Sequence, residues 1–176
     1  WIADVIRRDM HVAPHIIGWG VNTEEWTPGE DPHVYALWNK ARVDTVSDPA
    51  PMLALAASVP DMPFLTTFGN GGMNVRTTGR QPYEVMKHYI RNAGVYLATV
   101  TETFGIGTLE AMACGVPVLG FNHAGTADIV EHGVTGFLAE PGDMEGLREG
   151  LAYCLQYRDV LGANAREAAK QHTWDR

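Results

Sequence analysis

Short apolar runs alternate with amphipathic segments along most of the chain. Runs rich in β-branched and aromatic residues, bounded by glycine, proline or asparagine, predict strands at 33–38, 63–69, 74–79, 95–100, 116–121 and 136–139. Segments whose apolar residues recur three or four positions apart predict helices at 50–59, 82–94, 126–133, 144–157 and 159–171. Because strands that alternate with helices form parallel β-α-β units, the pattern predicts a three-layer α/β fold with a doubly wound parallel sheet.

Single residues mark several boundaries of these elements. Pro82 suits a first helical turn and Gly94 suits a C-terminal cap, so they bracket one helix. Asp143 is an N-cap for the helix that follows it. The first thirty residues are the least regular part of the chain, and residues 18–32 are expected to form a loop.

Composition and charge narrow the classes of function. A chain of 176 residues has about the length of one domain, and a hydrophobic content of 45% is enough for an apolar core. The formal net charge of −8 argues against nucleic acid and anionic membrane surfaces as general partners. An acidic domain can still bind an anion where a few cations and helix N-termini are focused at one site.

Other features of the sequence bear on the cellular compartment and on the length of the whole protein. Cys114 and Cys154 form no Cys-x-x-Cys motif, so we expect buried thiols in a reducing compartment, which favours the cytoplasm. No apolar run approaches the roughly 18–20 residues of a transmembrane helix, and no secretory signal is visible. The chain begins with Trp1 rather than methionine, so we expect a longer protein, whose other part could touch a membrane.

The segment "TETFGIGTLEAMACGVPVLGF" (101–121) carries the strongest chemical signal. Ligands of open parallel sheets bind beyond the carboxyl ends of the strands, and this segment begins where the predicted strand 95–100 ends. A helix is expected to begin near Gly107 or Thr108. Its free N–H groups and its dipole would suit a phosphate or a diphosphate. Gly105 and Gly107 would let such a ligand approach the backbone closely.

Two glutamates flank this expected anion site. Glu110 is expected in the first turn of the helix, where its carboxylate could accept hydrogen bonds from the vicinal hydroxyls of a ribose. Glu102, on the other side of the anion site, could accept hydrogen bonds from a second sugar. The spacing alone allows another interpretation, in which Glu110 only complements the helix dipole and Glu102 is a solvated loop residue.

The residues around the two glutamates resemble the signature of a known family. Glu102 and the segment "FG-x-x-x-LEAMACGVPVL" resemble the E-x(7)-E motif of retaining glycosyltransferases with the GT-B architecture. "IIGWGVN" resembles that family's "IPNGVD" segment, and "NVRTTG", "FNHAGTADIVEHGVTGFLAEPGD" and "HTWDR" resemble later blocks. The resemblance covers nearly the whole chain. It identifies residues 1–176 as a C-terminal nucleotide-sugar-binding domain with a Rossmann-like sheet, which is one half of a GT-B architecture.

The resemblance implies a role for each residue of the site. Glu110 would bind the ribose of a UDP-, GDP- or ADP-sugar, and Glu102 would orient the donor sugar. Main-chain N–H groups would contact the donor sugar at Phe104, Gly105 and Ile106, and the diphosphate at Thr108 and Leu109. The base would lie near Val75, Arg76 and Thr77, with His123 beside the nucleotide or the sugar.

Members of the family usually bind the diphosphate with an arginine and a lysine from the loop after the first strand. Here that loop, "WNKARVDTVSDPAP", departs from the pattern, because Asn39 replaces the usual glycine and the usual lysine position falls near Asp48. Lys40 and Arg42 are the candidate cations, acting together or singly in a shifted register. Such cations and a helix N-terminus would stabilise the leaving diphosphate, so neither a metal nor a cofactor is expected. The sequence contains no H-E-x-x-H and no D-x-D motif.

Two other classes of function stay open on the sequence alone. One is a non-transferase enzyme of the same architecture, such as a nucleotide-sugar epimerase or a phosphorylase, which would lack so close a match to the motif. The other is a catalytically silent module that binds a sugar nucleotide. Since acceptors of this family bind mainly to an N-terminal domain, we expect the 176-residue chain to bind a nucleoside diphosphate with little or no transferase activity.

Overall fold

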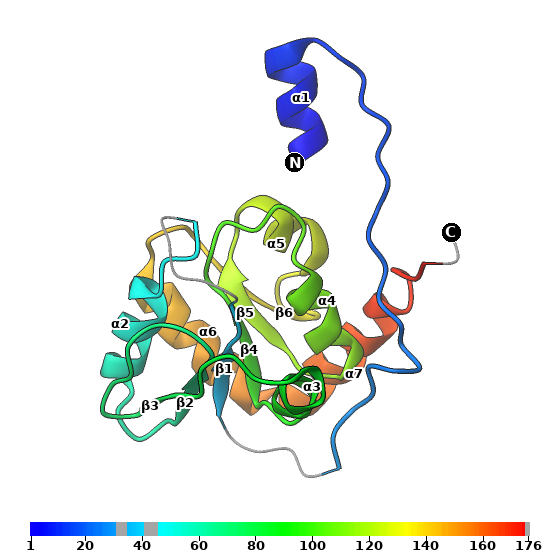
Figure 1. Cartoon of the computed structure of the whole chain (residues 1–176). Helices are drawn as coiled ribbons and strands as arrows, with labels where there is room; N and C mark the ends of the chain where they lie inside the picture. The colour runs from blue at the N-terminus through cyan, green and yellow to red at the C-terminus, as the bar shows by residue number, and fades with distance from the viewer. Residues whose placement is uncertain (31–34, 41–45, 175–176) are drawn as a thin grey trace.

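The chain folds around one parallel β-sheet (Figure 1). A computed structural model describes residues 1–30, 35–40 and 46–174. Within these residues the strand order is β3-β2-β1-β4-β5-β6, and every neighbouring pair is parallel. The strands are β1 (Ala36–Trp38), β2 (Phe64–Thr66), β3 (Val75–Thr77), β4 (Val95–Ala98), β5 (Val118–Phe121) and β6 (Gly136–Ala139). The order runs outward in both directions from the β1–β4 pair, so the predicted doubly wound sheet is confirmed.

Helices cover both faces of the sheet, which confirms the three layers. On one face lies an apolar cluster to which α2 (Ala50–Ser58) and α6 (Met144–Gln156) contribute. The cluster on the other face receives residues from α3 (Tyr83–Arg91), α4 (Ile106–Ala113), α5 (Ala124–Ile129) and α7 (Arg158–Ala169). Cys114 and Cys154 are buried free thiols, as predicted.

Strand β4 shows how the sequence specifies this burial. Tyr96 and Ala98 belong to one apolar cluster, whereas Val95 and Leu97 belong to the other. Successive side chains of a strand point to opposite faces of the sheet, so a strand covered on both sides is apolar throughout. The unbroken apolar run therefore marks β4 as central.

Several helix boundaries differ from the sequence-based expectations. Helix α4 begins at Ile106, after Gly105 in a left-handed conformation with φ +97°, so the prediction that Glu110 lies in the first turn is wrong. Helix α5 ends at Ile129 rather than near Gly133, because the chain turns there to enter β6. The N-cap prediction for Asp143 is confirmed, since the Gly146 N–H donates to its carboxylate at 2.9 Å.

The N-terminal helix α1 (Ile2–Met10) is an element that the sequence analysis did not predict. None of its residues is buried, and Figure 1 shows it apart from the sheet, joined to it by a long extended segment. Its start contacts the rest of the chain through Trp1, whose indole N–H donates to the Thr103 carbonyl at 3.1 Å. In the described part of the chain, no helix combines the length and apolar character needed to cross a bilayer.

Candidate functional site

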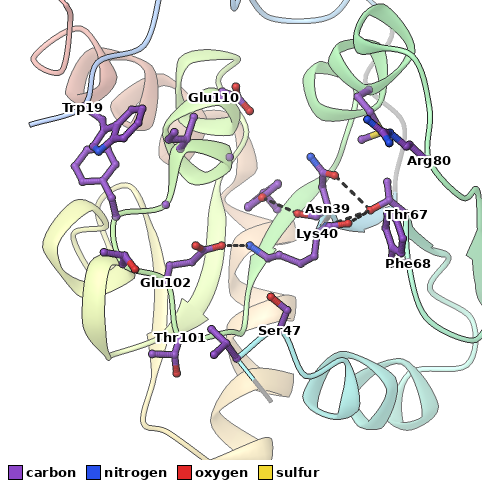
Figure 2. A pocket seen from close by; sticks show the side chains of 18 of the residues that line it. Trp19, Asn39, Lys40, Ser47, Thr67, Phe68, Arg80, Thr101, Glu102 and Glu110 are labelled. Carbon is purple, nitrogen blue, oxygen red and sulfur yellow. Dashed lines mark hydrogen bonds and ion pairs between the residues drawn. The ribbon is translucent and has the colours of Figure 1, made fainter. Parts of the chain in front are cut away.

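A cavity of about 890 Å³ opens beyond the carboxyl ends of β1, β2 and β4. This is the edge at which open parallel sheets bind ligands. The loops after these strands, the residues after β3 and the start of α4 form its walls. The side chains that carry its chemistry are those of Trp19, Asn39, Lys40, Ser47, Thr67, Phe68, Arg80, Tyr96, Thr101, Glu102 and Glu110 (Figure 2).

Lys40 and Glu102 form an ion pair inside the cavity. The Lys40 Nζ lies 2.5 Å from the Glu102 Oε1, and the two side chains are 7% and 29% exposed. Figure 2 shows them pointing at each other from the loops after β1 and β4. Burial lowers the pKa of Lys40, but Tyr96 and Glu102 more than offset this effect, so the net shift is upward and the ammonium stays charged. The sheet thus holds a buried cation beside a carboxylate that water can reach.

The backbone of Lys40 is fixed by a residue from the neighbouring strand. The Lys40 N–H donates to the Thr67 Oγ1 at 3.1 Å, and the Thr67 hydroxyl donates to the Lys40 carbonyl at 2.7 Å. Thr67 directly follows β2 and is buried. Because β1 and β2 are parallel and adjacent, the same edge of the sheet brings these two residues together.

The start of α4 forms the wall next to Glu102. Gly105 is the N-cap, and its carbonyl accepts hydrogen bonds from the N–H groups of Thr108 and Leu109 at 3.0 and 3.2 Å. The side chains of Thr108 and Leu109 are buried in the fold. A helix leaves its first N–H groups without an intrahelical acceptor, and here these belong to Ile106 and Gly107, which line the cavity. The positive end of the helix dipole faces the same space.

Glu110 lies in the second turn of α4 and has a different electrostatic environment from Glu102. Burial raises its pKa to about 7, and the nearby charge of Glu25 adds to the shift. Glu25 accepts a hydrogen bond from the Tyr83 hydroxyl at 2.9 Å and forms an ion pair with Lys87 at 3.5 Å. Near neutral pH the Glu110 carboxyl is therefore divided between its charged and neutral forms.

Some of the predicted site residues lie away from this cavity. Val75, Arg76 and Thr77 form the edge strand β3, where Val75 is buried and the other two are exposed. His123 lines a neighbouring cavity of about 210 Å³ and packs against the Trp1 ring at 5.9 Å between centroids. Arg42 lies outside the described residues.

Other residues line the cavity without having been predicted. Thr67 and Phe68 follow β2, and Arg80 follows β3 with two residues between. The rule that ligands bind at the carboxyl ends of parallel strands could have indicated all three. Trp19 carried no such signal, because it belongs to the extended segment after α1, whose return to the sheet is not encoded in a local pattern. In residues 1–30, 35–40 and 46–174 no three His, Cys, Asp or Glu side chains lie close enough to hold a metal ion.

Comparisons with known proteins agree with this fold. The sucrose-phosphate synthase of Thermosynechococcus elongatus superposes with a TM-score of 0.85 at 22% identity, over 98% of this chain and 52% of that one. The crystal structure of Anabaena Alr3699/HepE in complex with UDP and glucose superposes with a TM-score of 0.73 at 19% identity, over 88% of this chain and 51% of that one.

The sequence comparisons cover a narrower region. N-acetyl-alpha-D-glucosaminyl L-malate synthase of Bacillus anthracis is 39% identical over 75 residues, which is 41% of this chain and 20% of that protein. The chain thus spans about a fifth of this relative and about half of each solved structure. The family model described as "Glycosyl transferases group 1" matches residues 69–172, more than half of the 176 residues. The chain belongs to the group 1 glycosyl transferases.

Proposed function

We propose that this chain binds the nucleoside-diphosphate sugar from which the whole protein transfers a glycosyl group to an acceptor hydroxyl. The observation that carries the proposal is the buried Lys40 ammonium, paired with Glu102 and facing the same cavity as the start of α4. A cation and a helix N-terminus at one site can together bind the negative charge of a diphosphate. A volume of about 890 Å³ has room for a ligand of this size.

The two glutamates are proposed to hold the two sugars of the donor. Glu110, in its charged form, accepts hydrogen bonds from the ribose hydroxyls, and Glu102 orients the hydroxyls of the transferred sugar. The diphosphate lies between them. Its donors are the Lys40 ammonium and the N–H groups of Ile106 and Gly107, in preference to those of Thr108 and Leu109, which already donate to Gly105.

The base is proposed to lie toward the β3 side of the cavity. Phe68 and Arg80 line that wall, opposite Trp19 and Glu102 (Figure 2). A phenyl ring and a guanidinium plane are both suited to stack on a base. Arg80 also adds a positive charge on the β3 side of the cavity. Arg42 stays a candidate for a second cation. In this proposal the base contacts residues that follow β2 and β3, rather than Val75, Arg76 and Thr77 of β3 itself.

Transfer is proposed to proceed with retention at the anomeric carbon, as the E-x(7)-E resemblance implies. Breakage of the bond between the sugar and the diphosphate leaves positive charge on the sugar and negative charge on the phosphate oxygen. Lys40 stabilises that negative charge because it stays protonated although its side chain is buried. Glu102 lies beside the sugar and balances the developing positive charge there.

An acceptor-binding N-terminal domain is proposed for the whole protein. These two solved structures are about twice as long as this chain, and several apolar residues of segment 2–19 are exposed, including Met10, Ile16 and Ile17. Exposed apolar side chains of this number are typical of a surface that another part of a protein covers. The 176-residue chain is therefore expected to bind the nucleotide and to transfer little or no sugar.

Calorimetric titration of the chain with UDP, GDP and ADP tests the proposal, with UMP, GMP and AMP as controls. We expect one nucleoside diphosphate to bind and its monophosphate to bind more weakly, because the monophosphate lacks the phosphate that contacts Lys40. Glu110→Ala should weaken this binding, whereas Glu167→Ala, on the exposed face of α7, should not. If none of the three diphosphates binds, the proposal is wrong. Binding without transfer in the whole protein would indicate a silent binding module.

A further inference from the structure

Tyr96 is a buried polar residue at the floor of the cavity. It is the second residue of β4, it is 1% exposed, and it is one of the residues that line the cavity. The neighbouring positions in β4 are aliphatic, and an aliphatic residue would satisfy the apolar cluster to which Tyr96 belongs. The hydroxyl therefore needs an explanation beyond core packing.

The phenol contacts the loop that carries Lys40. The Lys40 Nζ lies 5.8 Å from the centroid of the Tyr96 ring, within the range of a cation–π interaction. The Tyr96 hydroxyl donates to the carbonyl of Asn39 at 3.4 Å. One side chain thus contacts both the ammonium and the backbone of the residue before it.

The same hydroxyl contacts the start of α4. A Cβ added to Gly107 would overlap the Tyr96 hydroxyl oxygen and would lie 3.3 Å from the Cζ. Gly107 does not have a positive φ, so this close approach rather than backbone conformation excludes a side chain. A side chain at position 107 would therefore collide with the Tyr96 hydroxyl, which accounts for the glycine there. Burial also raises the pKa of Tyr96, so the phenol stays neutral beside the lysine.

We propose that Tyr96 is a positioning residue that sets the separation between the Lys40 ammonium and the first N–H groups of α4. This inference rests on the proposed function, in which these two groups hold the diphosphate from two sides. Both contacts come from a single rigid ring in a central strand. Displacement of either group would spoil a geometry in which both donors must reach the same ligand.

Two substitutions and their combination test the role by calorimetry with the diphosphate that the wild-type chain binds. Gly107→Ala drives the helix start away from the phenol and should weaken binding about tenfold. Tyr96→Phe keeps the ring and should weaken binding about threefold. The double variant should bind more tightly than Gly107→Ala, because removal of the hydroxyl makes room for the added methyl group. Equal binding by Gly107→Ala and wild type, or no recovery in the double variant, would overturn the inference.

Tyr153→Phe is a matched control for the loss of a hydroxyl. The Tyr153 hydroxyl also donates to a carbonyl at 3.4 Å, that of Gly133, outside the cavity. Both Tyr→Phe variants should change the melting temperature by similar small amounts, and only Tyr96→Phe should change the affinity. Similar affinities for the two variants would assign Tyr96 a purely structural role.

A readout that needs no nucleotide separates this inference from the proposed function. The chain has three lysines, so ¹⁵N-lysine labelling gives few ammonium signals, and Lys40→Met assigns that of Lys40. In Tyr96→Phe the Lys40 ammonium protons should exchange faster with water, while those of Lys87 should not change. An unchanged Lys40 signal would contradict the positioning role. A wild-type chain that binds no diphosphate would overturn the proposed function instead.

Discussion

The two ends of the cavity carry the same acidic residue in opposite electrostatic settings. Glu102 forms an ion pair with Lys40, whereas the pKa of Glu110 is raised to about 7 by burial and by Glu25. The sequence motif presents the two glutamates as equivalent, and the fold makes them different. A charge next to a cation suits the end at which a sugar–phosphate bond breaks. A carboxyl whose pKa lies near neutral pH suits a site for neutral hydroxyls. Its ionisation would then control the affinity for the ligand that carries them.

Of the changes at the two glutamates and their partners, removal of the Lys40 charge should have the largest effect on nucleotide affinity. Lys40→Met keeps the apolar stem of the side chain and removes the charge, so Glu102 would then repel the diphosphate. We expect the affinity for the nucleoside diphosphate to fall about hundredfold, as measured by calorimetry. Lys170→Met removes a charge from an exposed lysine and should leave the affinity unchanged. A small loss with Lys40→Met would show that the helix N-terminus alone binds the diphosphate.

The Glu110 end should respond to pH. In the wild-type chain, affinity for the nucleotide should rise between about pH 6 and pH 8, as Glu110 loses its proton and can accept from both ribose hydroxyls. Glu110→Gln cannot ionise, so its affinity at pH 8 should be about tenfold lower and its pH profile nearly flat. A profile of the variant that keeps the wild-type midpoint would assign the titration to another group.

The same pKa shift predicts a pH dependence of stability. The ordinary pKa of the carboxyl is 4.5 and the folded value is about 7, so the folded state binds the proton more tightly. The free energy of unfolding should therefore lose a contribution as the pH rises from about 4.5 to 7. Glu110→Gln should remove this loss. The melting temperature of the variant, relative to that of the wild type, should therefore increase as the pH rises. A constant difference between the two proteins would contradict the shift.

A smaller change should follow at Glu25, which acts on Glu110 through its charge. Glu25→Gln should lower the midpoint of the affinity profile by less than about one pH unit, because burial is the larger cause of the shift. Lys87 and Tyr83 contact Glu25 and stay in place in this variant. A midpoint that does not move would show that burial alone raises the pKa of Glu110.

The smallest effect on binding is expected at a carboxylate that belongs to neither end. Asp143 caps α6 in the loop after β6, and it is not among the residues that line the cavity. Asp143→Ala should lower the free energy of unfolding by about 1 kcal/mol in urea denaturation and leave nucleotide affinity unchanged. Altered affinity in this variant would mean that stability and binding are not separable in this chain.

The sequence predicted most of the sheet and one wall of the cavity. The apolar run of β4 and the motif of Glu102 and Glu110 are local patterns; β4 lies at the centre of the sheet, and both glutamates line the cavity. Glu110 moved to the second helical turn because Gly105 ends the loop earlier than expected. Lys40 was predicted from its position after the first strand, but its pairing with Glu102 was not, since that contact joins the loops after two different strands.

The remaining site residues depend on tertiary structure rather than on local pattern. Tyr96 looks like any core residue until the start of α4 is seen to rest on its hydroxyl. Trp19 reaches the cavity through an extended segment whose path no periodicity encodes. Helix α1 was not predicted, although Ile2, Val5 and Ile6 recur at helical spacing, and none of its residues is buried.

A crystal structure of the chain with the nucleoside diphosphate that binds in calorimetry would show whether Lys40 and the start of α4 hold the diphosphate. We expect the phosphate oxygens within about 3 Å of the Lys40 Nζ and of the N–H groups at the start of α4, with the ribose hydroxyls on Glu110. A nucleotide bound elsewhere, or bound in the cavity with its diphosphate away from Lys40 and from α4, would contradict this expectation.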